Sequence, residues 1–313
     1  MAELRNELSW SRTRDGSFET CPRRYWFDYY GSWGGWKESS EGRTRELYVL
    51  KKLSTRWMWI GSAVHEAIEN VLRSLQRGVR KEAGAVAEAT VERMRVDFRD
   101  SRSGKHRERP GQHVGLFEHE YGIEVSQQRW KEGADHARAC IARFFESPYA
   151  ETFAGLPAES WLQVEKLDGF DQDGVRVHVK IDAVFRRPDG RVEIVDWKTG
   201  RRDRGGEGGN RIQLACYALH ALEKGWVDRP EDIVTVEYAL ATGTPYLREV
   251  DPAAITQVRE YIRTSIGGMK ALLDDVERNL ATEARFEPRP SSANCRWCNF
   301  RRVCPSAAPD RAH

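Results

Sequence analysis

The most telling absences in this chain of 313 residues concern membranes and nucleotide-driven motors. The chain contains no apolar run of about eighteen residues and no basic stretch followed by an apolar one, so neither a membrane-spanning helix nor a secretory signal is expected. It also lacks the phosphate loop G-x-x-x-x-G-K-S/T, which excludes an ATP-driven motor of that type, so any unwinding must come from a partner. We therefore expect a soluble protein of the cytoplasm, where thiols stay reduced.

A large excess of charge of one sign is missing as well. The formal net charge is +2, which is too small to indicate a nucleic-acid partner by itself. Basic residues are nonetheless bunched at 99–109, at 201–204 and at 296–302. The first run is equally well explained as a solvated loop, whereas the other two lie beside candidate functional segments and favour phosphate contact. The cations of the second run are Arg201, Arg202 and Arg204.

Two predicted strands carry acidic side chains and a lysine. Apolar and polar residues alternate over 175–185, which is typical of a half-buried strand, and Asp182 ends the polar row. A second strand is predicted over 192–198, where Asp196 and Lys198 are two residues apart and so point to the same face. Taken alone, two acids and a lysine on strands are more often solvated charges of an exposed hairpin.

The turn between these strands decides whether the two acids meet. Residues 188–190 read Pro-Asp-Gly, a turn signal with a glycine available for a left-handed conformation. A two-residue turn would place Asp182 opposite Trp197, whereas a three-residue turn places it opposite Asp196, and we predict the second register. Opposed Cβ atoms lie about 4.5–5.5 Å apart, so both carboxylates could bind one Mg²⁺ or Mn²⁺. Lys198 would then orient or help to deprotonate the attacking water and offset transition-state charge.

Helices before and after the predicted hairpin add further polar candidates. A helix opening at 61–68 places His65 at the edge of its apolar stripe, and an imidazole ligand would favour Mn²⁺ somewhat over Mg²⁺. A second helix follows the glycine-rich loop 199–209 and carries Gln213 and Tyr217, four residues apart and on one face. Taken singly, each of these residues is as well explained by packing or solvation.

Together and in this order, the residues resemble the RecB-type branch of the PD-(D/E)XK nuclease superfamily. The resemblance covers 61–76 and 161–220, and it predicts a restriction-endonuclease-like α/β fold, with a mixed sheet flanked by helices and carrying a helical insertion. It implies that the metal ligands are His65, Asp182, Asp196 and the backbone carbonyl of Trp197. It also implies that the remaining site residues are Lys198 for catalysis and Gln213 and Tyr217 as supports of the site and the DNA strand. Such proteins often carry an acid where Glu165 lies, but we first assign Glu165 a structural role.

Four of the six cysteines form an unusual pattern, with Cys21 near the start and Cys295, Cys298 and Cys304 near the end. Four thiolates suit tetrahedral Zn²⁺ or an iron–sulfur cluster. The other two, Cys140 and Cys216, lie next to apolar helix stripes and are interpreted as small core residues. The pattern resembles the iron–sulfur-stapled nucleases, including the CRISPR-associated adaptation exonucleases and the AddB-type repair nucleases. This resemblance implies a 4Fe–4S cluster that joins the two termini, with Zn²⁺ as the alternative.

The chain is expected to form one elaborated domain of four segments. These are 1–60 with the first cluster cysteine, 61–160 with the His65 helix and the insertion, 161–246 as the nuclease core, and 247–313. The last is predicted to hold a return helix over 255–280, about 39 Å long, and the three-cysteine end.

The sequence thus predicts a metal-dependent deoxyribonuclease, an exonuclease for single-stranded DNA or DNA ends in repair, recombination or anti-phage and CRISPR adaptation. A non-catalytic module that recruits a helicase or integrase, or an RNA-directed nuclease, is the alternative.

Overall fold

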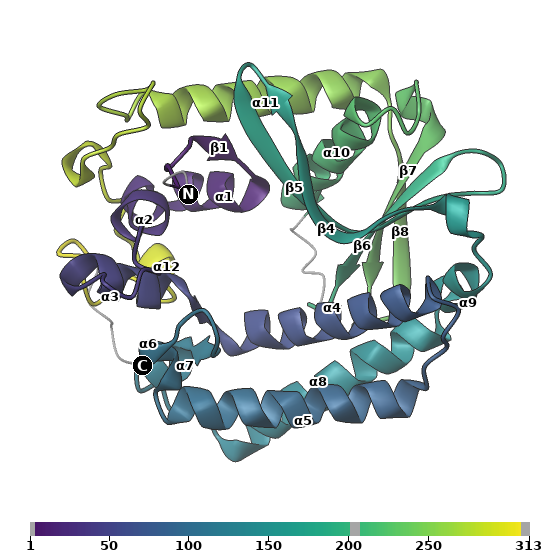
Figure 1. Cartoon of the computed structure of the whole chain (residues 1–313), viewed down its shortest axis with the longest axis horizontal. Coiled ribbons are helices and arrows are strands. Elements are labelled where there is room, and N and C mark those ends of the chain that lie inside the picture. The colour runs from purple at the N-terminus through teal and green to yellow at the C-terminus, as the bar shows by residue number, and fades with distance from the viewer. Residues whose placement is uncertain (1–3, 201–206, 308–313) are drawn as a thin grey trace.

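A computed structural model describes residues 4–200 and 207–307, and a mixed sheet of six strands lies at its centre (Figure 1). The strands of this sheet are β1 (Ser9–Trp10), β4 (Trp161–Gln172), β5 (Val175–Arg186), β6 (Val192–Lys198), β7 (Ile233–Ala239) and β8 (Thr244–Glu249). A separate parallel pair is formed by β2 (Leu53–Ser54) and β3 (Gly115–Leu116). The predicted mixed α/β sheet is confirmed.

Strand β5 organises the sheet. It pairs antiparallel with β4 along its length, parallel with β1 at Arg176 and Val177, and antiparallel with β6 from Ala183 onward. Strand β7 then joins β6 in parallel, and β8 joins β7 antiparallel. Because β4 occupies one edge of β5, β1 and β6 share the other edge, and residues 178–182 lie between them. The side chains that leave the sheet there line a cleft.

The β5–β6 hairpin has the predicted register. Ala183 is paired with Val195, and the N–H of Arg187 donates to the carbonyl of Arg191 at 2.8 Å across the turn at 188–190. The three-residue turn is therefore confirmed. Continued by one pair, the same register sets Asp182 opposite Asp196, as predicted.

Helices cover both faces of the sheet (Figure 1). One face packs against α4 (Arg56–Leu75), α8 (Gln127–Glu146) and α9 (Pro148–Ala154), with α5 (Ala83–Arg102) beyond them, and Val195 and Trp197 of β6 lie in this core. The other face packs against α10 (Glu207–Glu223) and α11 (Pro252–Lys270), where Ile194 lies. Trp197 thus points away from Asp196, as the alternation predicts. Throughout the described ranges, no helix combines the length and apolar character that a bilayer span requires.

Helix α4 begins at Arg56, five residues before the predicted start at Gly61. Thr55 supplies the N-cap, with its hydroxyl accepting the N–H of Met58 at 3.4 Å. The buried carboxylate of Glu118 accepts the N–H of Arg56, with both oxygens at 3.1 Å. Thr55 is a local start signal that the prediction missed, whereas Glu118 belongs to α7 (Phe117–Glu120), distant in sequence, and its contact could not be read from the local pattern.

The predicted return helix over 255–280 is wrong in its last third, because α11 ends at Lys270 after 19 residues. The chain then turns, and the N–H of Leu280 donates to the carbonyl of Asp275 at 2.9 Å. Asn279 adopts a left-handed φ of 50° and donates to the carbonyl of Asn6 at 2.9 Å. A contact to the N-terminal segment therefore replaces the last helical turns, and Val276 is left exposed.

An N-terminal and a C-terminal segment meet at one corner, built by α1 (Arg12–Thr20), α2 (Pro22–Trp26), α3 (Gly42–Lys51) and α12 (Ser292–Cys295). The N–H of Arg289 donates to Cys21 Sγ at 3.3 Å, and Asn294 Nδ2 donates to the carbonyl of Thr20 at 3.1 Å. One small pocket at this corner is lined by all four cysteines of the predicted staple: Cys21, Cys295, Cys298 and Cys304. Cys140 and Cys216 are buried in helices, as predicted.

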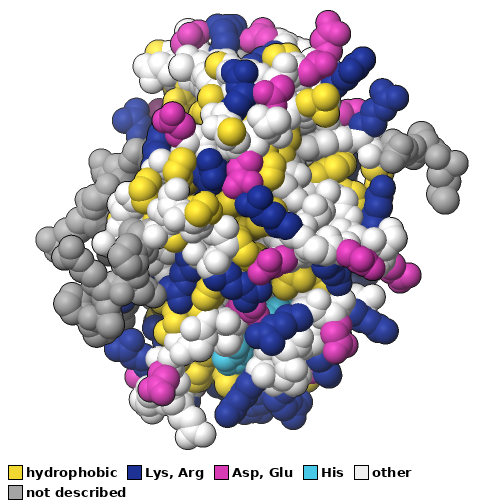
Figure 2. Space-filling view, turned by 90° about the vertical axis from the view of Figure 1, so that its left-hand side faces the viewer, with side chains coloured by type: hydrophobic (Ala, Val, Ile, Leu, Met, Phe, Trp, Pro, Cys, Tyr) yellow, Lys and Arg dark blue, Asp and Glu magenta, His cyan; other side chains and the backbone are white. Residues whose placement is uncertain are grey.

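A buried glutamate connects this corner to the helical insertion. Glu120 receives hydrogen bonds from His106 of α6 (Lys105–Glu108) at 2.9 Å, from Arg107 at 3.0 Å, and from Arg302 of the C-terminal segment. Arg107 of the run 99–109 and Arg302 of the run 296–302 are therefore both engaged in ion pairs with Glu120. Figure 2 likewise shows Lys and Arg interspersed with Asp and Glu over this side of the molecule, in keeping with the small net charge.

We expect a Glu120→Gln variant to be less stable than the native protein at neutral pH, and its stability to change less as the pH falls. Burial alone would raise the pKa of Glu120, but the hydrogen bonds from His106, Arg107 and Arg302 lower it from 4.5 to about 2. Because the folded-state pKa is depressed, the stability that this carboxylate contributes is present in full above about pH 5 and is lost as the pH falls towards 2. Urea unfolding across this range should show a lower stability at neutral pH and a shallower pH dependence in the variant. Parallel curves for the two proteins would contradict this.

Candidate functional site

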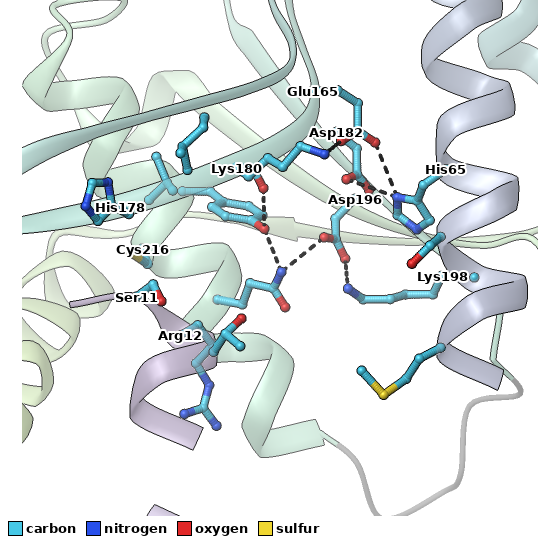
Figure 3. A pocket seen from close by; sticks show the side chains of 18 of the residues that line it. Ser11, Arg12, His65, Glu165, His178, Lys180, Asp182, Asp196, Lys198 and Cys216 are labelled. Atoms are coloured by element: carbon cyan, nitrogen blue, oxygen red, sulfur yellow. Dashed lines mark hydrogen bonds and ion pairs between the residues drawn. The ribbon is translucent and has the colours of Figure 1, made fainter. Parts of the chain in front are cut away.

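A cleft of about 1280 Å³ opens where β5 lies between β1 and β6 (Figure 3). Its walls come from β4, β5 and β6, from one face of α4, from the middle of α10 and from the start of α1. The cleft brings together six of the side chains that the sequence singled out for chemistry: His65, Asp182, Asp196, Lys198, Gln213 and Tyr217. Segments more than a hundred residues apart in sequence therefore share one solvent-accessible space.

Three side chains in the cleft form a group of potential metal ligands. His65 Nδ1 lies 3.3 Å from Glu165 Oε1 and 3.3 Å from Asp182 Oδ1, and ligand atoms of the three residues lie within 4.8 Å of one another. Both carboxylates are buried. Carboxylate oxygens with one imidazole nitrogen suit Mg²⁺ or Mn²⁺, and buried anions at this spacing favour a cation between them. This group could hold a divalent metal ion.

Glu165 is the site residue that the sequence reasoning undervalued. Its φ is +46°, which is strained for a residue with a side chain, and this backbone aims a carboxylate into the cleft, where Lys180 Nζ lies 2.6 Å from Oε2. A local signal was available. Asp173-Gly174 is a two-residue hairpin turn that pairs Gln172 with Val175. Counting back along β4 from that turn places Glu165 beside Asp182.

His65 carries a proton in the absence of a bound cation. Burial alone would lower its pKa, but the charge of Asp182 and the hydrogen bonds to Asp182 and Glu165 raise it to about 10. The protonated imidazole therefore offsets part of the negative charge of the group. A divalent ion bound at Nδ1 would take the place of that proton, since only the neutral imidazole is a ligand.

Asp196 and Lys198 form a close ion pair beside this group, with 2.5 Å between Lys198 Nζ and Asp196 Oδ2. Burial and the neighbouring Asp182 raise the pKa of Asp196 to about 7, and Lys198 opposes that shift. Burial would lower the pKa of Lys198, but Asp196 outweighs it and raises the pKa. Lys198 is therefore a stable cation, which favours orienting water and offsetting charge over accepting a proton.

Helix α10 fixes the position of Asp196. Gln213 Nε2 donates to Asp196 Oδ1 at 3.3 Å and to the hydroxyl of Tyr217 at 2.6 Å, and that hydroxyl donates to the carbonyl of Lys180 at 2.9 Å. Burial raises the pKa of Tyr217 well above its ordinary value, so the phenol stays a neutral donor. The spacing of four residues therefore places both side chains in the site rather than on a solvated face.

Two sequence predictions are not decided by this geometry. The main chain of Trp197 reaches the site through its N–H, which donates to Asp182 Oδ2 at 2.6 Å, and the role of its carbonyl as a metal ligand stays a prediction. The predicted phosphate-binding residues Arg201, Arg202 and Arg204 lie outside the described residues.

The chain is similar to a known protein family. A family model described as the PD-(D/E)XK nuclease superfamily matches residues 9–305, which is nearly the whole chain. The mixed sheet flanked by helices fits the restriction-endonuclease-like fold expected of that family. No curated protein matches the chain.

Two solved structures show a weak likeness. A crystal structure of SSO0001 is 17% identical with a TM-score of 0.30, covering 61% of this chain and 92% of that one. A crystal structure described as a "putative exonuclease" from Eubacterium rectale is 14% identical with a TM-score of 0.41, covering 88% of this chain and 89% of that one. Neither is similar enough to support a functional assignment.

Proposed function

We propose a function for this chain, which belongs to the PD-(D/E)XK nuclease superfamily. It hydrolyses phosphodiester bonds of DNA with the help of a divalent metal ion, acting as an exonuclease on single strands or DNA ends. The observation that carries this proposal is the group His65, Glu165 and Asp182 within one cleft beside the Asp196–Lys198 pair.

The residues of the cleft have different proposed roles in binding the metal, positioning water and holding the ligands. His65, Asp182 and Asp196 hold Mg²⁺ or Mn²⁺, and the position of Glu165 makes it a fourth candidate ligand. When bound, the ion would supply positive charge to polarise the scissile phosphate and to make water a better nucleophile. Lys198 orients that water and offsets the charge that builds on the phosphate oxygens. Gln213 and Tyr217 keep Asp196 in place, so the ligands need little rearrangement.

The biological setting of the proposal follows from the sequence resemblance. We place the enzyme in the cytoplasm, in DNA repair, recombination or anti-phage and CRISPR adaptation. A helicase or integrase is its candidate protein partner, since the sequence lacks a P-loop motor of its own.

We further propose that the corner cysteines Cys21, Cys295, Cys298 and Cys304 bind a 4Fe–4S cluster. Their shared pocket and the contacts between the two terminal segments support a metal staple. Four thiolates would also suit Zn²⁺, which remains the alternative occupant.

Cleavage assays on fluorescent single-stranded DNA, double-stranded DNA and RNA with Mn²⁺ test the activity. Asp196→Asn and Lys198→Met are expected to slow DNA cleavage by about 10²- to 10³-fold, because each removes charge that acts on the phosphate or its metal. Glu193→Gln is the matched control. It replaces another buried carboxylate of β6, which accepts the Tyr149 hydroxyl at 2.6 Å and does not line the cleft, so it should cut at the native rate.

Other outcomes point elsewhere. Cleavage that persists in both site variants would refute the site assignment. Cleavage of RNA alone would make the protein an RNA-directed nuclease. Tight binding of DNA without any cleavage would make it a non-catalytic module that recruits another enzyme.

A further inference from the structure

Two large side chains stay exposed at the first turn of α4, inside the cleft. Trp57 keeps 54% of its surface exposed and Met58 keeps 60%, and both line the same cleft as His65. Single exposed apolar residues are common on protein surfaces, but an indole in the wall of a polar cleft offers a flat apolar face to whatever enters. The metal chemistry of the site makes no use of this face.

The indole of Trp57 is held in position. The guanidinium of Arg56 lies 4.7 Å from the ring centroid, and the imidazole of His136 stands perpendicular to the ring at 6.2 Å. His136 is itself fixed by a contact of 2.7 Å between its Nε2 and the carbonyl of Thr199, which follows the catalytic strand. With the bond from Arg56 N–H to Glu118, these contacts hold the start of α4 rigid. A ligand that stacks on Trp57 therefore loses little binding free energy to ordering this side chain.

The position of Trp57 relative to the metal group suits a strand that runs along α4. Trp57, Gly61 and His65 are spaced by four residues and lie on one helix face, so the indole is about 12 Å from His65 along the axis. A Cβ added at Gly61 would lie 3.1 Å from Thr199 Oγ1, which shows how closely α4 approaches the end of β6. A strand whose phosphate lies at the metal group would bring a neighbouring base to the indole.

We propose that Trp57 is a stacking platform for an unpaired nucleobase of the strand being cut. Arg56 adds positive charge for a phosphate beside it, and Met58 supplies an apolar side wall. Neighbouring bases cover the faces of each base in a duplex, so only unpaired bases can stack on the indole. The inference rests on the proposed nuclease function and deepens it, because it names a residue that makes the cleft prefer single strands.

Binding of labelled oligodeoxythymidylate tests the platform. Lys198→Met serves as a slow-cutting background, in which fluorescence anisotropy is measured with and without Trp57→Ala and Trp57→Phe. Trp57→Ala should weaken single-strand binding by about tenfold or more and leave duplex binding unchanged, whereas Trp57→Phe keeps a ring and restores most of the affinity. Trp36→Ala is the matched control, because Trp36 is 37% exposed and does not line the cleft.

An abasic scan separates stacking from a general loss of structure. One abasic position moved stepwise along the oligonucleotide should weaken binding at a single site, and at that site Trp57→Ala should cause no further loss. Native affinity in Trp57→Ala, or equal losses at every position, would overturn the platform and leave the nuclease proposal intact. A protein that neither binds nor cuts any nucleic acid would overturn both.

Discussion

An Asp182→Asn variant is expected to cut DNA about 10²- to 10³-fold more slowly than the native protein. Asp182 contacts the site on two sides, since Oδ2 accepts the N–H of Trp197 at 2.6 Å and Oδ1 lies 3.3 Å from His65 Nδ1. The amide oxygen of asparagine can still accept from Trp197, so the strand should keep its geometry, but the charge that attracts a divalent ion is gone. Titration calorimetry with Mn²⁺ should show the affinity falling together with the cleavage rate.

The stability of this variant separates chemistry from folding. Asp182 raises the pKa of both Asp196 and His65, so the substitution removes a repulsion between two buried carboxylates and also an attraction to the imidazolium. Because these two effects oppose each other, the melting temperature should change little. Asp168→Asn is the control, because Asp168 pairs with Lys224 at 2.8 Å and does not line the cleft. We expect this control to bind Mn²⁺ and cut DNA normally. Native cleavage by Asp182→Asn would exclude Asp182 from the metal site.

If the corner cysteines hold the proposed metal, a Cys298→Ala variant is expected to lose it and to melt about 10 °C below the native protein. Cys298 shares its pocket with Cys21, whose Sγ accepts the N–H of Arg289, so the site joins segments at opposite ends of the chain. Since a metal held by all four thiolates closes a loop of nearly the whole sequence, its loss should loosen both ends together. Limited proteolysis should therefore cut the N-terminal and C-terminal segments at the same protease concentration.

Cys140→Ala is the matched control for this experiment. It removes the same atoms from a fully buried position in α8, outside the cysteine pocket, and should leave the metal content unchanged. Brown native protein that bleaches in Cys298→Ala would support the iron–sulfur cluster. Colourless protein that releases zinc would assign Zn²⁺ instead, and an unchanged metal content in Cys298→Ala would refute the staple.

Much of the sheet beneath the site could be predicted because its signals are local. The alternation over 175–185 and the turn at 188–190 predict where β5 ends, where β6 lies and how the two strands pair. Side chains alternate strictly along a strand, so a known turn length fixes every facing pair. The same logic at Asp173-Gly174 would have placed Glu165 in the site.

Predictions failed where the deciding contact comes from a distant segment. The end of α11 depends on Asn279 reaching Asn6, a contact that leaves no mark on the helical pattern itself. The start of α4 depends partly on Glu118 in the same way, although Thr55 gave a local N-cap signal there. An apolar stripe continues to look helical even where a tertiary hydrogen bond offers the backbone a better arrangement.

The sequence by itself determined the order of the candidate residues, the two strands that carry Asp182, Asp196 and Lys198, and the register that makes the two acids face each other. The tertiary structure decided what these groups do to one another. Packing α4 and α10 against the sheet buries Asp196, brings His65 to Asp182 and Glu165, whose charges keep it protonated, and brings Gln213 to Asp196. Burial and charge act through space, so the electrostatics of the site existed only once those helices were in place.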